Sequence, residues 1–378
     1  MNSITKETRR ESYDAILPKV KKRSRLILET LGDRQMTASE ITEELVAAGK
    51  IPYFNRNYVA PRLTELKDIG VLETVGRRKA TRRTPPRPYG PERSCRMSLD
   101  DITLAVDYFD LKKIAESGQC FRWKELGPGK YLIPSGQTCA IMEQKEPDDD
   151  LHLLIEEGTL PLWQDYLNYG ERYGSIIREA REATLADGSP DLFLREAVLE
   201  AAGVQILTQD LWETLVSFVI SQNNNIPRIK KLVAALCKQF GERRQLAGHE
   251  FYTFPTWDRL AGQDLSGIGL GYRDKYVEQL AQNVADGRID LHELTGMETE
   301  QARTYLKSIH GVGNKVADCV LLFGLHRVEA FPVDTWIRQV IDEHYGGKFP
   351  VEHYDGHAGI IQQFIFYYMQ QHKGGKTT

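Results

Sequence analysis

Cysteine is scarce in this sequence, and its spacing excludes several kinds of metal and disulfide protein. The five cysteines are Cys95, Cys120, Cys139, Cys237 and Cys319, and no two of them form a CxxC pair. Zinc ribbons and iron–sulfur clusters need closely spaced cysteines, and small secreted scaffolds need a dense disulfide framework. The sequence therefore predicts a protein of a reducing, intracellular compartment, without a metal centre built from cysteine.

Long apolar runs are also missing. No uninterrupted apolar stretch approaches the roughly 20 residues that a membrane-spanning helix needs, and the opening MNSITKETRRESYD lacks the apolar core of a secretory signal. We therefore expect no membrane contact and no secretion, with the protein acting in the cytoplasm, nucleoid or nucleus. We also expect a monomer.

Charge is nearly balanced over the whole chain but unevenly distributed. The formal net charge is −4, yet residues 1–95 contain 20 Lys and Arg against 12 Asp and Glu, whereas residues 96–378 contain 29 against 41. A basic segment on an acidic body is typical of a protein whose basic part binds a polyanion. The alternative is an ordinary solvated surface.

Residues 1–90 have the pattern of a small helical DNA-binding domain. Two helices are expected within residues 23–48, with Ile41 and Leu45 on one apolar face, and a third helix begins near Asn57. A strand, a glycine turn and a basic return follow, which contain Arg77, Arg78, Lys79, Arg82 and Arg83. The segment resembles a winged helix-turn-helix, whose third helix would enter the major groove while the basic residues lie along phosphates. A winged helix that binds another protein is the alternative.

Composition divides the rest of the chain into a linker and two further parts. The stretch TPPRPYGPE is too rich in proline and glycine for a regular element, so the first domain ends near residue 90 and residues 91–99 form a linker. Residues 100–190 contain short runs of period two and are expected to form an antiparallel β-sheet subdomain. The expected strands are TLAVDYF, QCFRW, KYLIP, CAIME and LHLLIEE. Residues 191–378 have helical periodicity, so the predicted fold class is α+β and mainly helical.

Two predicted helices are joined by the short turn HGVG near residue 311. Ala302, Leu306 and Ile309 share one face of the first helix, and NKVADCVLLFGL starts the second. Gly311 and Gly313 allow the backbone to turn tightly and to approach a phosphate, which the free N–H groups of the second helix would face. Such a helix-hairpin-helix binds the DNA backbone without reading its sequence.

Lys315 is unusual because it stands in the first turn of a helix that is otherwise almost wholly apolar. Burial and the positive end of the helix dipole both disfavour an ammonium ion. A neutral amine is a nucleophile, and lysines activated in this way form Schiff bases. The alternative is a lysine whose charged end reaches solvent and neutralises a DNA phosphate.

Asp334 is a candidate partner for this lysine. It immediately precedes an amphipathic stretch, so it could cap the N-terminus of a helix. A carboxylate beside a nucleophilic lysine can also stabilise positive charge on a sugar or help to deprotonate the amine. The two roles are compatible.

Five motifs carry a family resemblance. They are SGQCFRW (117–123), SQNNNIPRI (221–229), GLGYR (269–273), GVGNKVADC (311–319) and PVD (332–334). Together they make residues 100–372 similar to the 8-oxoguanine DNA glycosylases of the helix-hairpin-helix–GPD superfamily. The resemblance implies a helix-hairpin-helix core with a β-sheet subdomain, acting in DNA base-excision repair. The winged-helix-like segment lies outside the usual family pattern.

The resemblance implies roles for the reacting and base-binding residues. Lys315 would attack the sugar C1′ of a flipped nucleotide and displace its base, Asp334 would be the essential aspartate, and the Schiff base would support β-elimination at the abasic site. The carbonyl of Gly118 would accept the N7 proton that 8-oxoguanine has and guanine lacks. The remaining contacts with the base would come from Cys319 and Phe366 on its two faces and from Gln362 on its Watson–Crick edge. Taken alone, Cys319 and Phe366 are more often plain core residues, and Gln362 is more often a surface amide.

The resemblance also implies contacts with the opposite strand. Asn223 would fill the gap that the flipped base leaves, and Arg228 and Arg273 would donate to the unpaired cytosine, for which the planar guanidinium is well suited. Tyr272 would wedge against the neighbouring base pair. Without the resemblance, the three successive asparagines would be interpreted as a helix cap and a loop.

Four positions depart from the family pattern. Trp336 stands where better-known relatives place a phosphate-binding histidine, and Met369 replaces an acidic residue near the base pocket. His310 and Asn314 also differ, in positions that should not affect the chemistry.

The implied partner is duplex DNA containing 8-oxoguanine opposite cytosine. No cofactor or catalytic metal is implied, and the one ion left open is a structural monovalent or divalent cation at the 311–313 hairpin. Two other functions stay open: a helix-hairpin-helix glycosylase for another damaged base, and a DNA-binding regulator with an inactive glycosylase body. The predicted base pocket disfavours the first, and the intact Lys315 and Asp334 disfavour the second.

Overall fold

The computed structural model describes residues 22–31, 34, 36, 38–48, 63, 98–354 and 356–373. The chain divides into two compact units, Met1–Arg96 and Met97–Thr378, and each is described by itself. In the first unit, helices α2 (Lys22–Leu31) and α3 (Ala38–Ala47) confirm the two helices expected within residues 23–48. Ile27, Ile41 and Leu45 are fully buried there. The predicted third helix from Asn57 and the basic hairpin lie outside the described residues.

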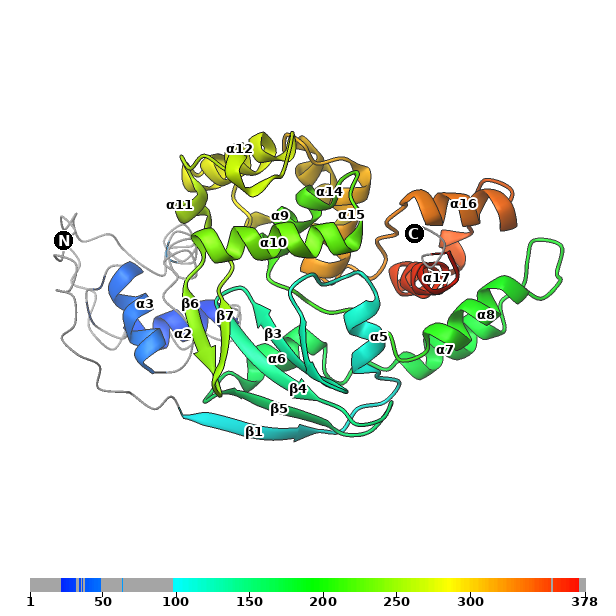
Figure 1. Cartoon of the computed structure of the whole chain (residues 1–378), viewed down its shortest axis with the longest axis horizontal. Coiled ribbons are helices and arrows are strands. Elements are labelled where there is room, and N and C mark those ends of the chain that lie inside the picture. The colour runs from blue at the N-terminus through cyan, green and yellow to red at the C-terminus, as the bar shows by residue number, and fades with distance from the viewer. Residues whose placement is uncertain are drawn as a thin grey trace, which may run out of the picture. The chain divides into compact units, whose positions relative to one another are not determined.

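An antiparallel five-stranded sheet opens the second unit (Figure 1). Its spatial order is β1 (Leu99–Leu104), β5 (Leu151–Glu156), β4 (Thr138–Glu143), β3 (Lys130–Ser135) and β2 (Lys124–Gly127). One face packs on Trp163 and its neighbours, and the other packs on Leu246 and Phe251 of a separate hairpin, β6 (Arg243–Leu246) and β7 (His249–Tyr252). Because both faces are covered, β3 and β4 are nearly continuous apolar runs rather than alternating ones.

The expected strands are confirmed for KYLIP, CAIME and LHLLIEE, whereas TLAVDYF overlaps β1 only at its first two residues. The prediction of a strand at QCFRW is wrong. This segment is a loop whose polar side chains bond to other elements instead of joining a ladder. Arg122 forms a buried ion pair with Glu213 at 2.7 Å, and the side chain of Gln119 bonds to the backbone near residue 205. The β6–β7 hairpin was not predicted, because it interrupts a stretch with helical periodicity.

Helices form most of the second unit, and most of them share one large apolar core. Its central helix is α9 (Leu211–Ser221), in which every residue from Trp212 onward is buried. This burial on all sides explains why the helix has no polar face. The remaining helices are α5 (Leu111–Glu116), α6 (Leu160–Leu167), α7 (Tyr173–Arg181), α8 (Leu192–Ala201), α10 (Ile226–Phe240), α11 (Trp257–Leu260), α12 (Arg273–Ala285), α13 (Glu293–Gly296), α14 (Thr299–Ser308), α15 (Asn314–Gly324), α16 (Thr335–His344) and α17 (Ala358–Lys373).

The predicted helix-hairpin-helix is formed by α14 and α15, which pack against each other, and α15 also packs against α9. The α+β fold with a mainly helical core is therefore confirmed. Among the described helices, none combines the length and the apolar character that crossing a bilayer requires.

Candidate active site

Lys315 stands at the start of α15, in the wall of a cavity. The helix begins after Gly313, whose extended backbone caps it without a side chain. Lys315 is half-buried. Its Nζ lies 3.4 Å from Ser221 Oγ and 4.8 Å from the centre of the Phe218 ring. Both neighbours belong to α9, so the packing of α9 against α15 fixes the position of the amine.

Asp334 lies on the same cavity, at the N-cap of α16. Its carboxylate accepts the backbone N–H of Ile337 at 2.8 Å, which caps the helix as expected. Burial raises the pKa of Asp334, against the opposing effects of that N–H and of the charge on Lys315. The charged atoms of Lys315 and Asp334 do not lie within ion-pair distance of each other. The raised pKa makes this carboxylate a better proton acceptor than an exposed one.

The cavity has a volume of about 110 Å³. It is lined by six residues that the sequence predicted for catalysis or base binding, which are Gly118, Lys315, Cys319, Asp334, Gln362 and Phe366. These residues come from the loop between α5 and β2, from α15, from the start of α16 and from α17. The fold therefore gathers at one place side chains that lie far apart in the sequence.

Gly118 must be a glycine for two reasons. Its φ of +75° is a conformation that other residues rarely adopt, and an added Cβ would lie 2.9 Å from a carbon of the Phe366 ring. Two glutamines fix its loop, because the buried Gln363 donates to the Ser117 carbonyl at 2.6 Å and the partly buried Gln209 donates to the Gln119 carbonyl at 2.8 Å. The backbone at Gly118 is thus held rigidly against the cavity.

Two side chains give the cavity an apolar lining on α15 and α17. Burial raises the pKa of the Cys319 thiol to about 11, although the charge on Lys315 acts in the opposite direction. The thiol is therefore neutral at physiological pH. Phe366 packs beside Trp336, with ring centres 5.3 Å apart and planes tilted by 36°. Trp336 thus supports an aromatic wall of the cavity.

Gln362 combines burial with an unused hydrogen-bonding atom. The residue is 3% exposed, and its Oε1 is buried without a hydrogen-bond partner. An unpaired buried oxygen is costly for a folded protein, of the order of 1–3 kcal/mol. Because Gln362 lines the cavity, this unpaired atom indicates a place where a polar ligand would bind.

A second group of predicted residues forms an exposed cluster outside the cavity. Asn223 has a φ of +48° and donates from Nδ2 to the hydroxyl of Tyr272 at 3.0 Å. The tyrosine residue is 49% exposed. Arg273, by contrast, is buried, and its guanidinium donates to the carbonyls of Gln222, Asn223 and Leu270. In this structure Arg273 therefore holds the turn that presents Asn223, and its donation to a cytosine stays a prediction.

The hairpin between α14 and α15 is connected to this exposed cluster. Gln222 donates from Nε2 to the Gly311 carbonyl at 2.9 Å. Gly311 has a φ of +85°, and a Cβ there would lie 2.6 Å from the ring of Tyr276. Tyr276 in turn contacts the ring of His310, with centres 5.0 Å apart. The hairpin and the Asn223 turn are thus tied together by side chains.

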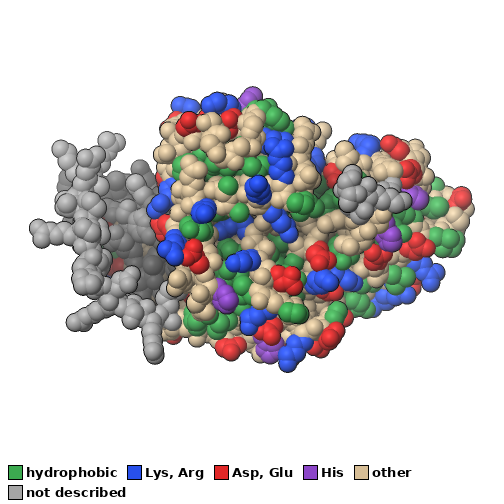
Figure 2. All heavy atoms as spheres, viewed as in Figure 1, with side chains coloured by type: hydrophobic (Ala, Val, Ile, Leu, Met, Phe, Trp, Pro, Cys, Tyr) green, Lys and Arg blue, Asp and Glu red, His purple; other side chains and the backbone are tan. Residues whose placement is uncertain are grey.

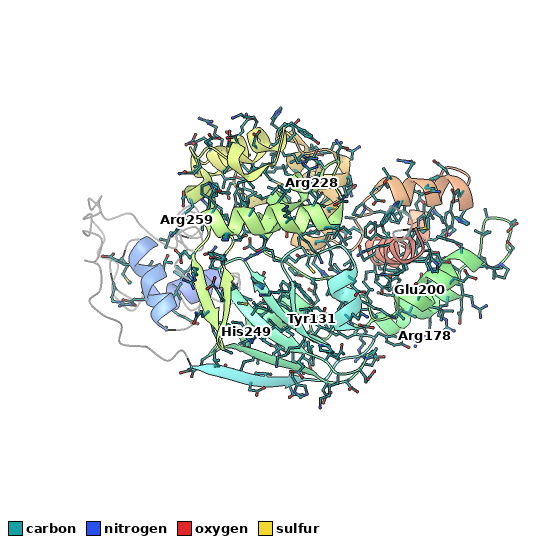
Figure 3. All side chains as sticks on the ribbon, viewed as in Figure 1. Tyr131, Arg178, Glu200, Arg228, His249 and Arg259 are labelled. Atoms are coloured by element: carbon teal, nitrogen blue, oxygen red, sulfur yellow. The ribbon has the colours of Figure 1, made fainter. Side chains whose placement is uncertain are left out.

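The remaining predicted residues have less definite surroundings. Arg228 is exposed near the start of α10 (Figure 3), and Met369 is buried in the helical core. The basic residues Arg77, Arg78 and Lys79 lie outside the described residues. In the part of the chain that the structure describes, no group of three His, Cys, Asp or Glu side chains could hold a metal ion. The predicted cation at the hairpin stays a prediction.

The sequence did not reveal Phe218, Ser221, Trp336 or Gln363 as parts of the site. Ser221 opens one of the recognised motifs, but its contact with Lys315 depends on the packing of α9 against α15. Gln363 adjoins a predicted residue, yet only the structure shows that it holds the Gly118 loop. No local pattern could have indicated these contacts.

Comparisons with known proteins agree on one family. Residues 101–215 match the family model described as the 8-oxoguanine DNA glycosylase N-terminal domain, and residues 216–350 match the model described as HhH-GPD superfamily base excision DNA repair protein. Residues 1–100 lie outside both.

Individual relatives are consistent with these matches. An N-glycosylase/DNA lyase of Saccharomyces cerevisiae is 35% identical over 275 residues, covering 66% of this chain and 72% of that protein. The N-glycosylase/DNA lyase OGG1 of Arabidopsis thaliana is 30% identical over 250 residues, and the match spans 59% of this chain and 63% of the plant protein.

A solved structure supports the same assignment. The 8-oxoguanine glycosylase/lyase of Clostridium acetobutylicum, in complex with double-stranded DNA containing cytosine opposite 8-oxoG, has 31% identity and a TM-score of 0.65, covering 71% of this chain and 93% of that one. The chain therefore belongs to the 8-oxoguanine DNA glycosylase family of the HhH-GPD superfamily.

Proposed function

We propose that this protein removes 8-oxoguanine opposite cytosine from duplex DNA and then cleaves the strand at the resulting abasic site. The observation that carries the proposal is that Lys315, Asp334 and the four predicted base-binding residues line one cavity. An amine, a carboxylate and a pocket for a planar base are the parts that a glycosylase/lyase needs. The reaction takes place on cellular DNA, wherever the cell keeps it.

The first step is attack by the Lys315 amine on C1′ of the flipped nucleotide. The new N–C1′ bond forms as the bond from C1′ to N9 of the base breaks, and the bonding electrons leave with the base, which then takes up a proton. Asp334 acts electrostatically on the positive charge that develops on the sugar and accepts a proton from the lysine nitrogen. The raised pKa of this carboxylate supports the second role.

The second step uses the Schiff base that forms when the sugar ring opens. The imine acidifies the hydrogens on C2′, a base removes one of them, and the electrons form a C2′–C3′ double bond as the 3′ phosphate leaves. Water then hydrolyses the imine and frees Lys315. No cofactor enters this sequence, because the imine itself is the electron sink.

Recognition of the damaged base depends on one proton. The Gly118 carbonyl would accept the N7 hydrogen of 8-oxoguanine, whereas the lone pair on N7 of guanine would repel it. A rigid carbonyl gives such discrimination only if it cannot move away, and the glutamines around residues 117–119 support this requirement. The ring faces would contact Cys319 and Phe366, and the unpaired Oε1 of Gln362 would accept from the Watson–Crick edge.

The exposed cluster is suited to the strand opposite the lesion. Asn223 is presented at a strained turn, and Tyr272 stands beside it as a half-exposed ring. We infer that Asn223 enters the gap left by the flipped base and that Tyr272 presses on the adjacent pair. Arg228 donates to the unpaired cytosine, while Arg273 positions the turn.

Borohydride trapping tests the proposal. The wild-type protein should form a covalent adduct with a duplex carrying 8-oxoguanine opposite cytosine, and Lys315→Gln should abolish it. Lys307→Gln is a matched control, because Lys307 is an exposed lysine on the other helix of the hairpin. A parallel cleavage assay over duplexes with other lesions should show preference for 8-oxoguanine. No adduct with any lesion would contradict the proposal.

A further inference from the structure

Helix α10 differs in charge from the acidic body around it. Its 15 residues include Arg228, Lys230, Lys231 and Lys238 and no Asp or Glu. Residues 96–378 as a whole carry 41 acidic and 29 basic residues. The positive side chains of this helix repel one another, and a negatively charged partner would relieve that repulsion.

Three of these cations lie on the solvent side of the helix. Arg228, Lys231 and Lys238 are exposed, at a spacing that places them on one face, whereas Ile229 and Leu236 of the opposite face are buried. We call these three residues the α10 basic face. Figure 2 shows several Lys and Arg side chains over the region where Figure 1 places α10.

The α10 basic face is not neutralised within the described part of the chain. No ion pair there includes Arg228, Lys231 or Lys238. The bond from Arg243 is the main cause that lowers the pKa of Glu250, and the charge on Lys238 contributes least to that shift. Several other exposed cations do have carboxylate partners, as in the pair between Lys130 and Glu143 at 2.8 Å.

The helix starts three residues after Asn223, beside the exposed cluster that the proposed function assigns to the strand opposite the lesion. Ile226 and Ile229 of its first turn line the cavity from the side opposite the α10 basic face, while Arg228 of the same turn is exposed. From Arg228 to Lys238 the helix rises about 15 Å, which corresponds to about four base pairs of B-form DNA at 3.4 Å each. A duplex contacted by Asn223 and Arg228 therefore reaches the first turn of α10, from which the basic face extends.

We propose that Lys231 and Lys238 of the α10 basic face bind the phosphates of the duplex flanking the lesion, while Arg228 at its start contacts the unpaired cytosine. The proposal rests on duplex DNA being the substrate. It adds a DNA-contacting surface to the hairpin and the Asn223 turn. The second unit would then attract DNA electrostatically without residues 1–95. Lysines on a smooth helical surface contact phosphate oxygens as point charges and do not read bases.

The test is the salt dependence of binding to an undamaged duplex, measured with the full chain. Each phosphate contact contributes about 0.9 to the slope of log K against log salt. Lys231→Gln/Lys238→Gln should therefore reduce the slope by about 1.8 and weaken binding roughly eightfold per contact at 0.1 M salt. Lys130→Gln removes a paired lysine on the sheet and should leave the slope unchanged.

Excision under single-turnover conditions with saturating enzyme is measured in parallel. The double variant should keep the wild-type rate, because neither lysine lines the cavity. An unchanged salt slope with normal excision would overturn this inference alone, whereas absent excision by the wild type would overturn the proposed function. If the double variant bound polyglutamate more weakly than the wild type but bound DNA equally well, the α10 basic face would belong to an acidic protein partner. That result would also overturn the inference.

Discussion

The position of Lys315 depends on neutral neighbours. Ser221 donates its hydroxyl hydrogen to the Phe218 carbonyl at 2.8 Å, which leaves the oxygen free to accept from Lys315. The ring of Phe218 covers another side of the amine. A strong ion pair would hold the nitrogen away from a substrate carbon, so this loose arrangement suits a nucleophile that must move towards C1′.

Gln362 and Gln363 give a matched pair of substitutions at the residue scale. Gln362→Leu removes a buried oxygen without a partner and should raise the free energy of unfolding by about 1 kcal/mol, while excision falls because the base loses a polar contact. Gln363→Leu leaves the buried Ser117 carbonyl without its hydrogen-bond donor and should lower the free energy of unfolding by about 1–3 kcal/mol. Urea unfolding measures both. A loss of stability in Gln362→Leu would show that this oxygen has a partner in the folded protein.

Gly118 and Gly158 give a second pair. Both have positive φ, at +75° and +80°, so alanine at either should cost about 1 kcal/mol of stability. Only Gly118 has a neighbour within 4 Å of the added Cβ, namely Phe366 and Ile226. Gly118→Ala should therefore also impair excision of 8-oxoguanine, measured as kcat/KM, whereas Gly158→Ala should not. Equal excision by the two variants would show that the loop around residue 118 has no role in base recognition.

Residue types alone indicated only part of the site. Lys315 was visible because a lysine at the start of an apolar helix is rare, and Asp334 because it precedes an amphipathic stretch. The roles of Gly118, Cys319, Gln362 and Phe366 came from the family resemblance. Trp336 was noted as a departure, but its contact with Phe366 depends on how α16 and α17 pack.

At the scale of elements, the N-terminus of α16 combines a structural and a chemical role in Asp334. Because burial raises its pKa, the protonated form is favoured in the folded state. Its contribution to stability is therefore present at low pH and is lost as the pH rises through the raised pKa. Above that pKa the buried, ionised carboxylate destabilises the folded state, and the active site retains this cost.

Asp334→Asn separates these roles, since asparagine also caps helices well. The variant should be at least as stable as the wild type at pH 7, and its advantage should shrink as the pH falls through the raised pKa. Excision should drop by about 10²-fold or more. Asp334→Ala, which loses the cap, should cost about 1 kcal/mol relative to Asn. Unfolding curves at several pH values and single-turnover excision test both; normal excision by Asp334→Asn would contradict the role in catalysis.

Elements with strong periodicity were predicted well, and elements determined by distant contacts were not. The helices around α9, α14, α15 and α17 have apolar faces that a sequence pattern reveals. Residues 119–123 alternate like a strand, but the pair between Arg122 and Glu213 ties them to α9 instead. The β6–β7 hairpin contains Arg243 and Arg244, and it forms because Leu246 and Phe251 cover the sheet.

At the scale of the whole molecule, we propose two sources of DNA affinity. The basic segment 1–95 carries a net positive charge, and the body carries the α10 basic face within an acidic surface. Deletion of residues 1–95 should weaken binding to undamaged duplex and flatten its salt dependence. Excision by saturating enzyme should persist, because the cavity belongs entirely to the second unit. Salt titrations of the truncated and full chains provide the measurement. Identical slopes would show that the basic segment serves another partner.

The central claim is that one amine, that of Lys315, attacks the sugar. The most direct test is to reduce the trapped adduct formed with an 8-oxoguanine duplex, to digest the protein and to locate the modified residue by mass spectrometry. The account predicts a sugar-derived mass on Lys315 and on no other lysine. A modification found on a different lysine or on an α-amino group, with Lys315 unmodified, would contradict it.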